Sequence, residues 1–300
     1  MSLPPDTAPD SGVIHNIGYR SYQGPRLGRG YATGALFVQG LRAAYGLGRS
    51  GKSKVLPMLV AAALALPALI FVAVAIITKS DKLAVGYADY ISLSVMGIFV
   101  LLFLAAQAPV LMSRDLRHNT VPLYFSRPIT RGDYVQARFL AMAAALMLLM
   151  TVPLVLLYVG ALLAGLPFGE NTGHFAQGLF AALIYSALYS AIGLLIAAAT
   201  PRRGFGVAAI MGVMFVSIPL VGIVYGLGSP GVGPAPESAN WAAVLSPSTL
   251  VHGLVNEIFS ITTGGSMHAP GGLGIAVFAL ETAVLTGGSY WLLQRRYRNI

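Results

Sequence analysis

Six long apolar stretches without a single lysine or arginine constrain this chain more than any other feature. They cover residues 55–78, 91–112, 139–163, 179–200, 205–227 and 273–293, and each has 21 to 25 residues. An α-helix rises about 1.5 Å per residue, so roughly 20 residues cross a hydrocarbon core about 30 Å thick. The sequence therefore predicts an all-α integral membrane protein with six transmembrane helices.

The basic residues fall unequally on the two sides that alternating spans would create. One side carries 17 lysines and arginines, and the other carries only Lys79 and Lys82. Cytoplasmic loops hold the excess of basic residues, so we expect both termini in the cytoplasm. The same distribution accounts for the formal net charge of +9. It argues against nucleic-acid binding, which needs a basic surface gathered on one domain.

Composition leaves little room for a large soluble domain, since 56% of the residues are hydrophobic and 10% are charged. Residues 1–32 are rich in Gly, Pro, Arg and Tyr without periodicity, which predicts a flexible cytoplasmic tail before a permease-like domain at 33–300. Residues 1–12 lack an apolar core, so we expect no cleaved signal peptide. The absence of cysteine excludes disulfides and cysteine-ligated metals.

An N-terminal amphipathic elbow helix is expected ahead of the first span. One face of it would carry Leu36, Phe37, Gly40, Leu41, Ala44 and Tyr45. Such a helix can lie in the headgroup plane, and a poorly ordered basic flank is the alternative.

A short outer helix is expected just before the last span. Its apolar stripe consists of Leu250, Val251, Leu254, Val255, Ile258 and Phe259. Ser248 or Thr249 could cap it after Pro247. At about 11 residues it is too short to cross a membrane, which predicts an interfacial or re-entrant helix.

The cytoplasmic loop at 113–138 is too polar to span and too patterned for a tether. We expect Arg114, Asp115 and Arg117 to lie on a cytoplasmic extension of the second span. Thr130 can act as an N-cap for the third span, with Asp133 three positions later in the first turn.

Enzyme motifs occur only in contexts that do not suit them. Residues 46–53 match the P-loop pattern, but no soluble strand precedes them and a span follows at once. The G-x-G-x-x-G match at 226–231 falls in a predicted outer loop. The five histidines lack metal-site spacing, and none lies in a span, so a metalloprotease or an intramembrane serine protease is disfavoured.

Glu281 is the only acidic residue inside a span. A charged side chain at mid-membrane costs about 2.5–3.5 kcal/mol on insertion scales, and no basic residue is available at that depth. Gly274 and Gly288 share its helix face, which predicts packing against protein. Two interpretations stay open, namely a packed structural carboxyl group and a contact in a translocation path.

The loop and the outer segment together resemble a known family. The loop has Asp115 and Thr120, followed by Ser126, Arg127, Pro128, Ile129 and Arg131. Leu245, Ser246 and Pro247 precede the short outer helix. With six spans and an amphipathic helix before them, this pattern resembles the ABC type-2 transporter permeases, the membrane subunits of bacterial ABC exporters. Asp115 stands where that family commonly has Glu.

The resemblance implies a multi-pass transport subunit of the bacterial inner membrane that is no enzyme and binds no cofactor itself. Two permease copies, or this chain and a paralogue, would enclose the pathway, while two separate ATPase subunits would bind ATP and Mg. The implied coupling residues are Arg114, Asp115, Arg117, Arg127 and Arg131.

A hydrophobic substrate is suggested by the apolar spans. These are dotted with Tyr158, Tyr185, Tyr189, Phe215 and Tyr225. An autonomous secondary transporter or channel that uses Glu281 is the main alternative function. A membrane-embedded enzyme would need clustered catalytic groups at one depth, which the sequence does not offer.

Overall fold

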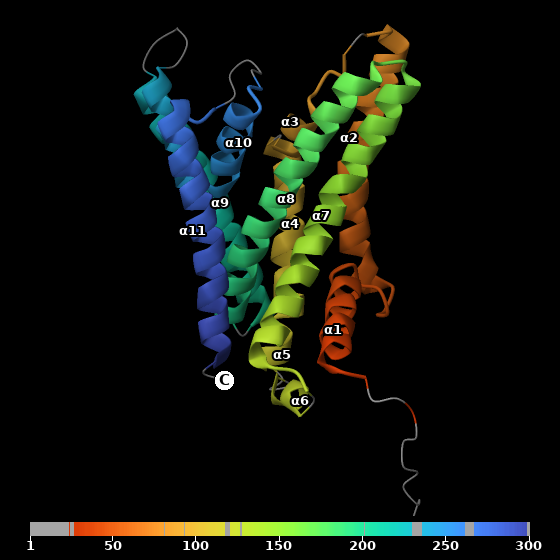
Figure 1. Ribbon diagram of the computed structural model, residues 1–300, viewed down its shortest axis with the longest axis vertical. Coiled ribbons are helices and arrows are strands. Elements are labelled where there is room, and N and C mark those ends of the chain that lie inside the picture. The colour runs from red at the N-terminus through yellow and green to blue at the C-terminus, as the bar shows by residue number, and fades with distance from the viewer. Residues whose placement is uncertain are drawn as a thin grey trace, which may run out of the picture.

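The computed structural model describes residues 24, 27–80, 82–92, 94–117, 121–126, 128–200, 202–229, 236–261 and 267–298. Within these ranges the chain is helical and contains no strand (Figure 1). The long helices are α2 (Lys52–Thr78), α4 (Ser94–Leu111), α7 (Arg131–Leu163), α8 (Phe168–Ala199), α9 (Arg203–Gly228) and α11 (Gly271–Arg298). The shorter elements are α1 (Arg29–Ala44), α3 (Tyr87–Ser92), α5 (Ser113–Arg117), α6 (Val121–Phe125), the 3₁₀ helix η1 (Glu237–Leu245) and α10 (Pro247–Ile258).

All six predicted spans are confirmed as helical segments of 22 to 33 residues that are long and apolar enough to cross a membrane. Their ends differ from the apolar boundaries. Within the expected span at 91–112 the structure describes the end of α3 and α4, and residue 93 between them lies outside the described residues. α7 begins at Arg131 instead of residue 139, because Thr130 and Asp133 form a complete capping box. The expected N-cap of the third span is therefore confirmed.

α1 begins at Arg29, before the expected domain boundary at 33 and before Leu36, where the apolar periodicity starts. Leu36, Gly40 and Ala44 are buried along its expected inner face, and α1 packs against α7. The hydroxyl of Tyr45, just after the helix, donates to the carbonyl of Ala145 at 2.8 Å. Burial raises the pKa of Tyr45 to about 12, so this hydroxyl keeps its proton at neutral pH.

α4, α7 and α8 form the centre of the bundle, and α2, α9 and α11 lie on its outside (Figure 1). In the most apolar part of the α4 segment 78% of the residues are buried, against 17% in that of α11. Close approach in the centre depends on small residues, as at Gly193, where a Cβ would meet Leu104 Cδ1 at 2.6 Å. The outer helices therefore offer their apolar faces to lipid or to other chains.

The short elements gather at the two ends of the bundle. α1, α5, α6 and the last turn of α11 lie at one end, here called the α5 end, and α3, η1 and α10 lie at the other, the α10 end (Figure 1). The short helix before the last span is present, but its expected caps are wrong. Ser246 is the N-cap residue of α10, and Thr249 Oγ1 instead donates to the carbonyls of Ala243 and Ser246.

Candidate functional site

The segment after α4 continues as α5, as the sequence predicts for residues 114–117. The buried hydroxyl of Ser113 donates to the carbonyl of Ala197 at 2.7 Å and so ties α5 to the end of α8. Arg114 and Arg117 are exposed, whereas Asp115 is only 9% exposed. One turn of helix therefore presents two guanidinium groups outward and one carboxylate inward.

The carboxylate of Asp115 binds two side chains of α7. Arg138 Nη2 lies 2.6 Å from Asp115 Oδ2, and the hydroxyl of Tyr134 donates to the same oxygen at 2.8 Å. Tyr134 and Arg138 are four residues apart, so one face of α7 presents both. The Arg138 side chain is only 5% exposed. The ion pair thus lies in a low-dielectric environment, where a charge without its partner is costly.

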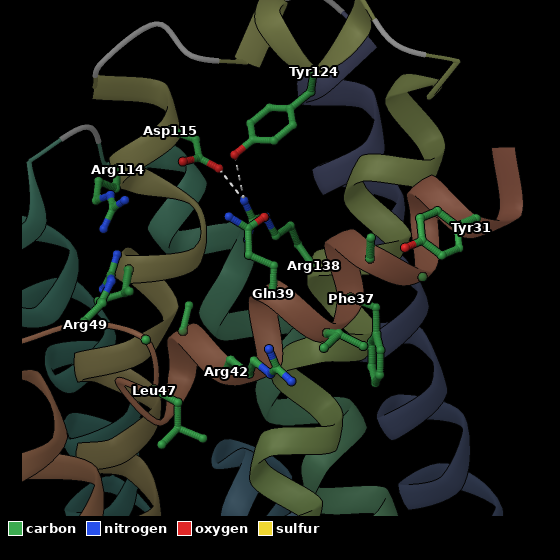
Figure 2. Close-up of a pocket in the computed structure, with 16 residues that line it drawn as sticks. Tyr31, Phe37, Gln39, Arg42, Leu47, Arg49, Arg114, Asp115, Tyr124 and Arg138 are labelled. Atoms are coloured by element: carbon green, nitrogen blue, oxygen red, sulfur yellow. Dashed lines mark hydrogen bonds and ion pairs between the residues drawn. The ribbon is translucent and has the colours of Figure 1, made fainter. Parts of the chain in front are cut away.

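Aromatic rings surround this pair and bring two further elements to it. The Tyr134 ring lies 5.4 Å from that of Tyr124 in α6 and 5.3 Å from that of Tyr297 in α11, between centroids. Arg138 lies over the Tyr134 ring at 5.2 Å. Its Nη2 also contacts the Tyr124 hydroxyl at 3.5 Å (Figure 2). Asp115, Tyr124, Tyr134, Arg138 and Tyr297 are hereafter the Asp115 network. It joins α5, α6, α7 and α11.

Arg131, at the first position of α7, also bridges elements. Its guanidinium lies 5.7 Å from the centre of the Phe125 ring in α6 and donates to the carbonyl of Arg298 at the end of α11. The side chain is nevertheless exposed. Arg127, the remaining implied coupling residue, lies outside the described residues.

A second ion pair attaches α1 to α7. Arg29 contacts both carboxylate oxygens of Asp133, at 2.6 Å and 2.8 Å, and Asp133 also completes the capping box with Thr130. The hydrogen bond to Asp133 raises the pKa of Arg29, so its guanidinium stays charged at neutral pH. Because the Arg29 side chain is 59% exposed, this pair orients α1 more than it stabilises the fold.

The structure brings Arg114, Asp115, Arg117 and Arg131 together at the α5 end. The buried partners Tyr134 and Arg138 were not singled out from the sequence. Arg138 was counted there as one of the basic residues that flank the membrane. Because the cap at Thr130 starts the helix before Arg138, and Arg138 lies one turn after Tyr134, the sequence does contain a signal that Arg138 shares a helix face with Tyr134.

Glu281 belongs to a different part of the molecule. It is half-buried in α11, beside the buried Thr282, and about 24 Å from Tyr297 by helical rise. Among the described residues no hydrogen bond or ion pair reaches its carboxyl group. Within the same ranges, no three His, Asp or Glu side chains are grouped so that they could hold a metal ion.

Comparison with known proteins places this architecture in a family. A family model described as ABC-2 family transporter protein matches residues 99–297, two thirds of the chain. No curated protein matches the sequence. The matched region begins within α4 and ends in the last turn of α11, so it contains the whole Asp115 network. The chain therefore belongs to the ABC-2 transporter family and is a permease component of an ABC transporter.

Proposed function

We propose that this chain is the permease subunit of an ATP-driven exporter in the bacterial inner membrane, and that its α5 end receives a separate ATPase subunit in the cytoplasm. The observation that carries the proposal is the construction of α5. Arg114 and Arg117 are exposed, while Asp115 in the same helical turn binds Arg138. Exposed guanidinium groups on a fixed helix suit the carboxylates of a partner surface.

The fixed helix also offers a route for mechanical coupling. Ser113 holds α5 to α8, and Asp115 holds it to α7. A displacement of α5 by the closing ATPase subunits would therefore reach two central helices directly. ATP and Mg would stay on the partner chains, and this chain would convert their closure into a change of helix packing.

Two permease copies, or this chain and a paralogue, would enclose the pathway. The exposed apolar faces of α2, α9 and α11 support this part of the proposal, because they provide surface for both a second permease and lipid. A pathway lined by such faces suits a hydrophobic substrate, such as a drug, peptide or lipid. The excess of basic residues near the α5 end supports its cytoplasmic orientation.

The coupling role is tested by charge reversal at Arg117, an exposed residue of α5. We expect Arg117→Glu to reduce both copurification of the ATPase subunit and ATP hydrolysis by the complex, with normal expression of the permease. Arg202→Glu is the matched control, because Arg202 is exposed in another loop and an acidic residue suits the N-terminus of α9. Equal ATPase binding and hydrolysis in both variants would exclude Arg117 from the coupling contact.

A second candidate is an autonomous transporter that uses Glu281. The observation in its favour is a half-buried carboxyl group in a span with no hydrogen bond among the described residues. Purification from native membranes without any ATPase, together with transport lost in Glu281→Gln, would favour this candidate. A stoichiometric ATPase and wild-type transport in Glu281→Gln would favour the permease.

A further inference from the structure

A pocket of about 820 Å³ opens beside the Asp115 network, between α1, the turn that follows it and the end of α4 (Figure 2). Its lining combines apolar side chains, including Phe37, Leu47 and Val110, with the guanidinium groups of Arg42, Arg49 and Arg114. None of the roles proposed above uses this cavity as a binding site.

The pocket carries a strong excess of positive charge. Its lining contains four arginines and a single carboxylate, Asp115, which already binds Arg138. Within the described part of the chain, Arg42, Arg49 and Arg114 form no ion pair with a carboxylate. In Figure 2 the guanidinium groups of Arg49 and Arg114 point toward one another. Like charges that line one cavity repel one another, and an anion bound among them relieves that repulsion.

The position of the pocket along the bundle points to the kind of anion. Leu47 and Arg49 lie in the turn just before α2 begins at Lys52, and Val110 lies in the last turn of α4. The pocket is therefore level with the ends of two spanning helices, which is the depth of phospholipid headgroups. Val55 and Met58, in the first turns of α2, are also exposed and apolar.

We propose that this pocket binds the phosphate group of an anionic phospholipid from the leaflet at the α5 end. Arg42 and Arg49 would donate hydrogen bonds to the phosphate oxygens, since the planar guanidinium fork matches phosphate geometry, and Arg114, which the coupling role also uses, would add its positive charge. Phe37 and Leu47 would contact the glycerol and the first carbons of the acyl chains. Basic pockets between spanning helices on the cytoplasmic side bind such headgroups. The proposal adds a lipid site to the transport role and needs no ATPase.

Native mass spectrometry of the purified full chain in detergent tests this site. Phosphatidylglycerol is titrated against phosphatidylcholine, and inorganic phosphate is added in a separate arm. We expect wild-type protein to retain phosphatidylglycerol preferentially. We expect Arg42→Gln/Arg49→Gln to bind it about tenfold to thirtyfold more weakly, since two phosphate-binding guanidinium groups are lost. Arg295→Gln/Arg296→Gln, which removes two exposed charges from the last turn of α11, should bind it as the wild type does.

Four results would overturn the proposal. The first is equal retention of both lipids by the wild type, and the second is equal loss of lipid binding in the two double variants. The third is displacement of the lipid by equimolar inorganic phosphate. The fourth is loss of a copurifying ATPase from Arg42→Gln/Arg49→Gln with unchanged lipid binding. The third would assign the pocket to a free anion, and the fourth to a protein partner. If the glutamine variant does not fold, Arg42→Lys/Arg49→Lys replaces it. That variant keeps the charge without the guanidinium fork, so it should bind more weakly than the wild type, and unchanged binding would count against the site.

Discussion

Asp115 and Arg138 show how one buried ion pair can organise the end of a helical bundle. Removing two charges from water is costly, and the cost is offset here by the 2.6 Å contact between them and by the hydroxyl of Tyr134. The rings of Tyr124 and Tyr134 face the guanidinium and add cation–π attraction. These residues lie on α5, on α6 and on one face of α7, so the ion pair fixes the relative positions of the three helices.

Loss of one partner should therefore be costly. Arg138→Leu leaves the Asp115 carboxylate buried without its main counter-charge, and we expect a loss of about 3–5 kcal/mol in the free energy of unfolding. The double variant Asp115→Leu/Arg138→Leu should lose much less, because no charge stays buried. Thermal unfolding in detergent, followed by circular dichroism, measures both. Arg296→Leu is the control at an exposed position, and its free energy of unfolding should stay within about 0.5 kcal/mol of wild type. A double variant no more stable than Arg138→Leu would contradict the buried ion pair.

The sequence identified Asp115 as a functional candidate but not its buried partner. Arg138 stands at the edge of an apolar stretch, where a basic residue is expected to flank the membrane. Its burial depends on tertiary contacts with Asp115, 23 positions earlier, and with the rings of Tyr124 and Tyr134. Periodicity and charge counts do not contain that information.

At the scale of elements, the apolar patterns located the helices and the local chemistry of polar residues set their ends. Thr130 and Asp133 were recognised as a start signal, and the capping box confirms it. The N-cap of α10 at Ser246 differs from the expected positions by two or three residues, because several hydroxyl residues in succession offer possible caps.

The turn between α1 and α2 gives a prediction at this scale. Gly46 has φ 67° and Gly48 has φ 78°, both in the left-handed region, so a side chain is strained at either position. A Cβ at Gly46 would also lie 2.6 Å from the carbonyl carbon of Ser53, whereas a Cβ at Gly48 would meet no atom within 4 Å. We expect Gly48→Ala to cost about 1–2 kcal/mol from backbone strain alone.

Gly46→Ala should cost more, about 3 kcal/mol, because the turn must also open to remove the clash. The difference in thermal midpoint between the two alanine variants measures the packing of this turn. Equal midpoints would show that the segment at 46–53 is not closed as described.

The same segment matches the P-loop pattern, so nucleotide binding is a further check. We expect Lys52→Ala to bind nucleotide at the level of wild type.

For the molecule as a whole, the alternation of six long helices places α1 and the end of α11 at the α5 end (Figure 1). The sequence predicts 17 basic residues on the side of both termini. The sequence does not predict how the helices share the lipid-facing surface, because hydropathy does not follow burial: α11, the least buried of the six, is also the least apolar. Burial separates the central α4 from the peripheral α2, α9 and α11, and only packing decides which helix is central.

The orientation itself is testable because the chain has no cysteine. Lys82→Cys places one thiol at the α10 end, and Arg296→Cys places one in the last turn of α11 at the α5 end; both positions are exposed. If basic residues hold the α5 end in the cytoplasm, a membrane-impermeant maleimide should label Lys82→Cys in intact cells and leave Arg296→Cys unlabelled. Permeabilised cells, in which both should react, provide the control. Labelling of Arg296→Cys in intact cells would show the opposite orientation. The α5 end, with Arg114 and Arg117, would then lie on the side that an ATPase does not reach.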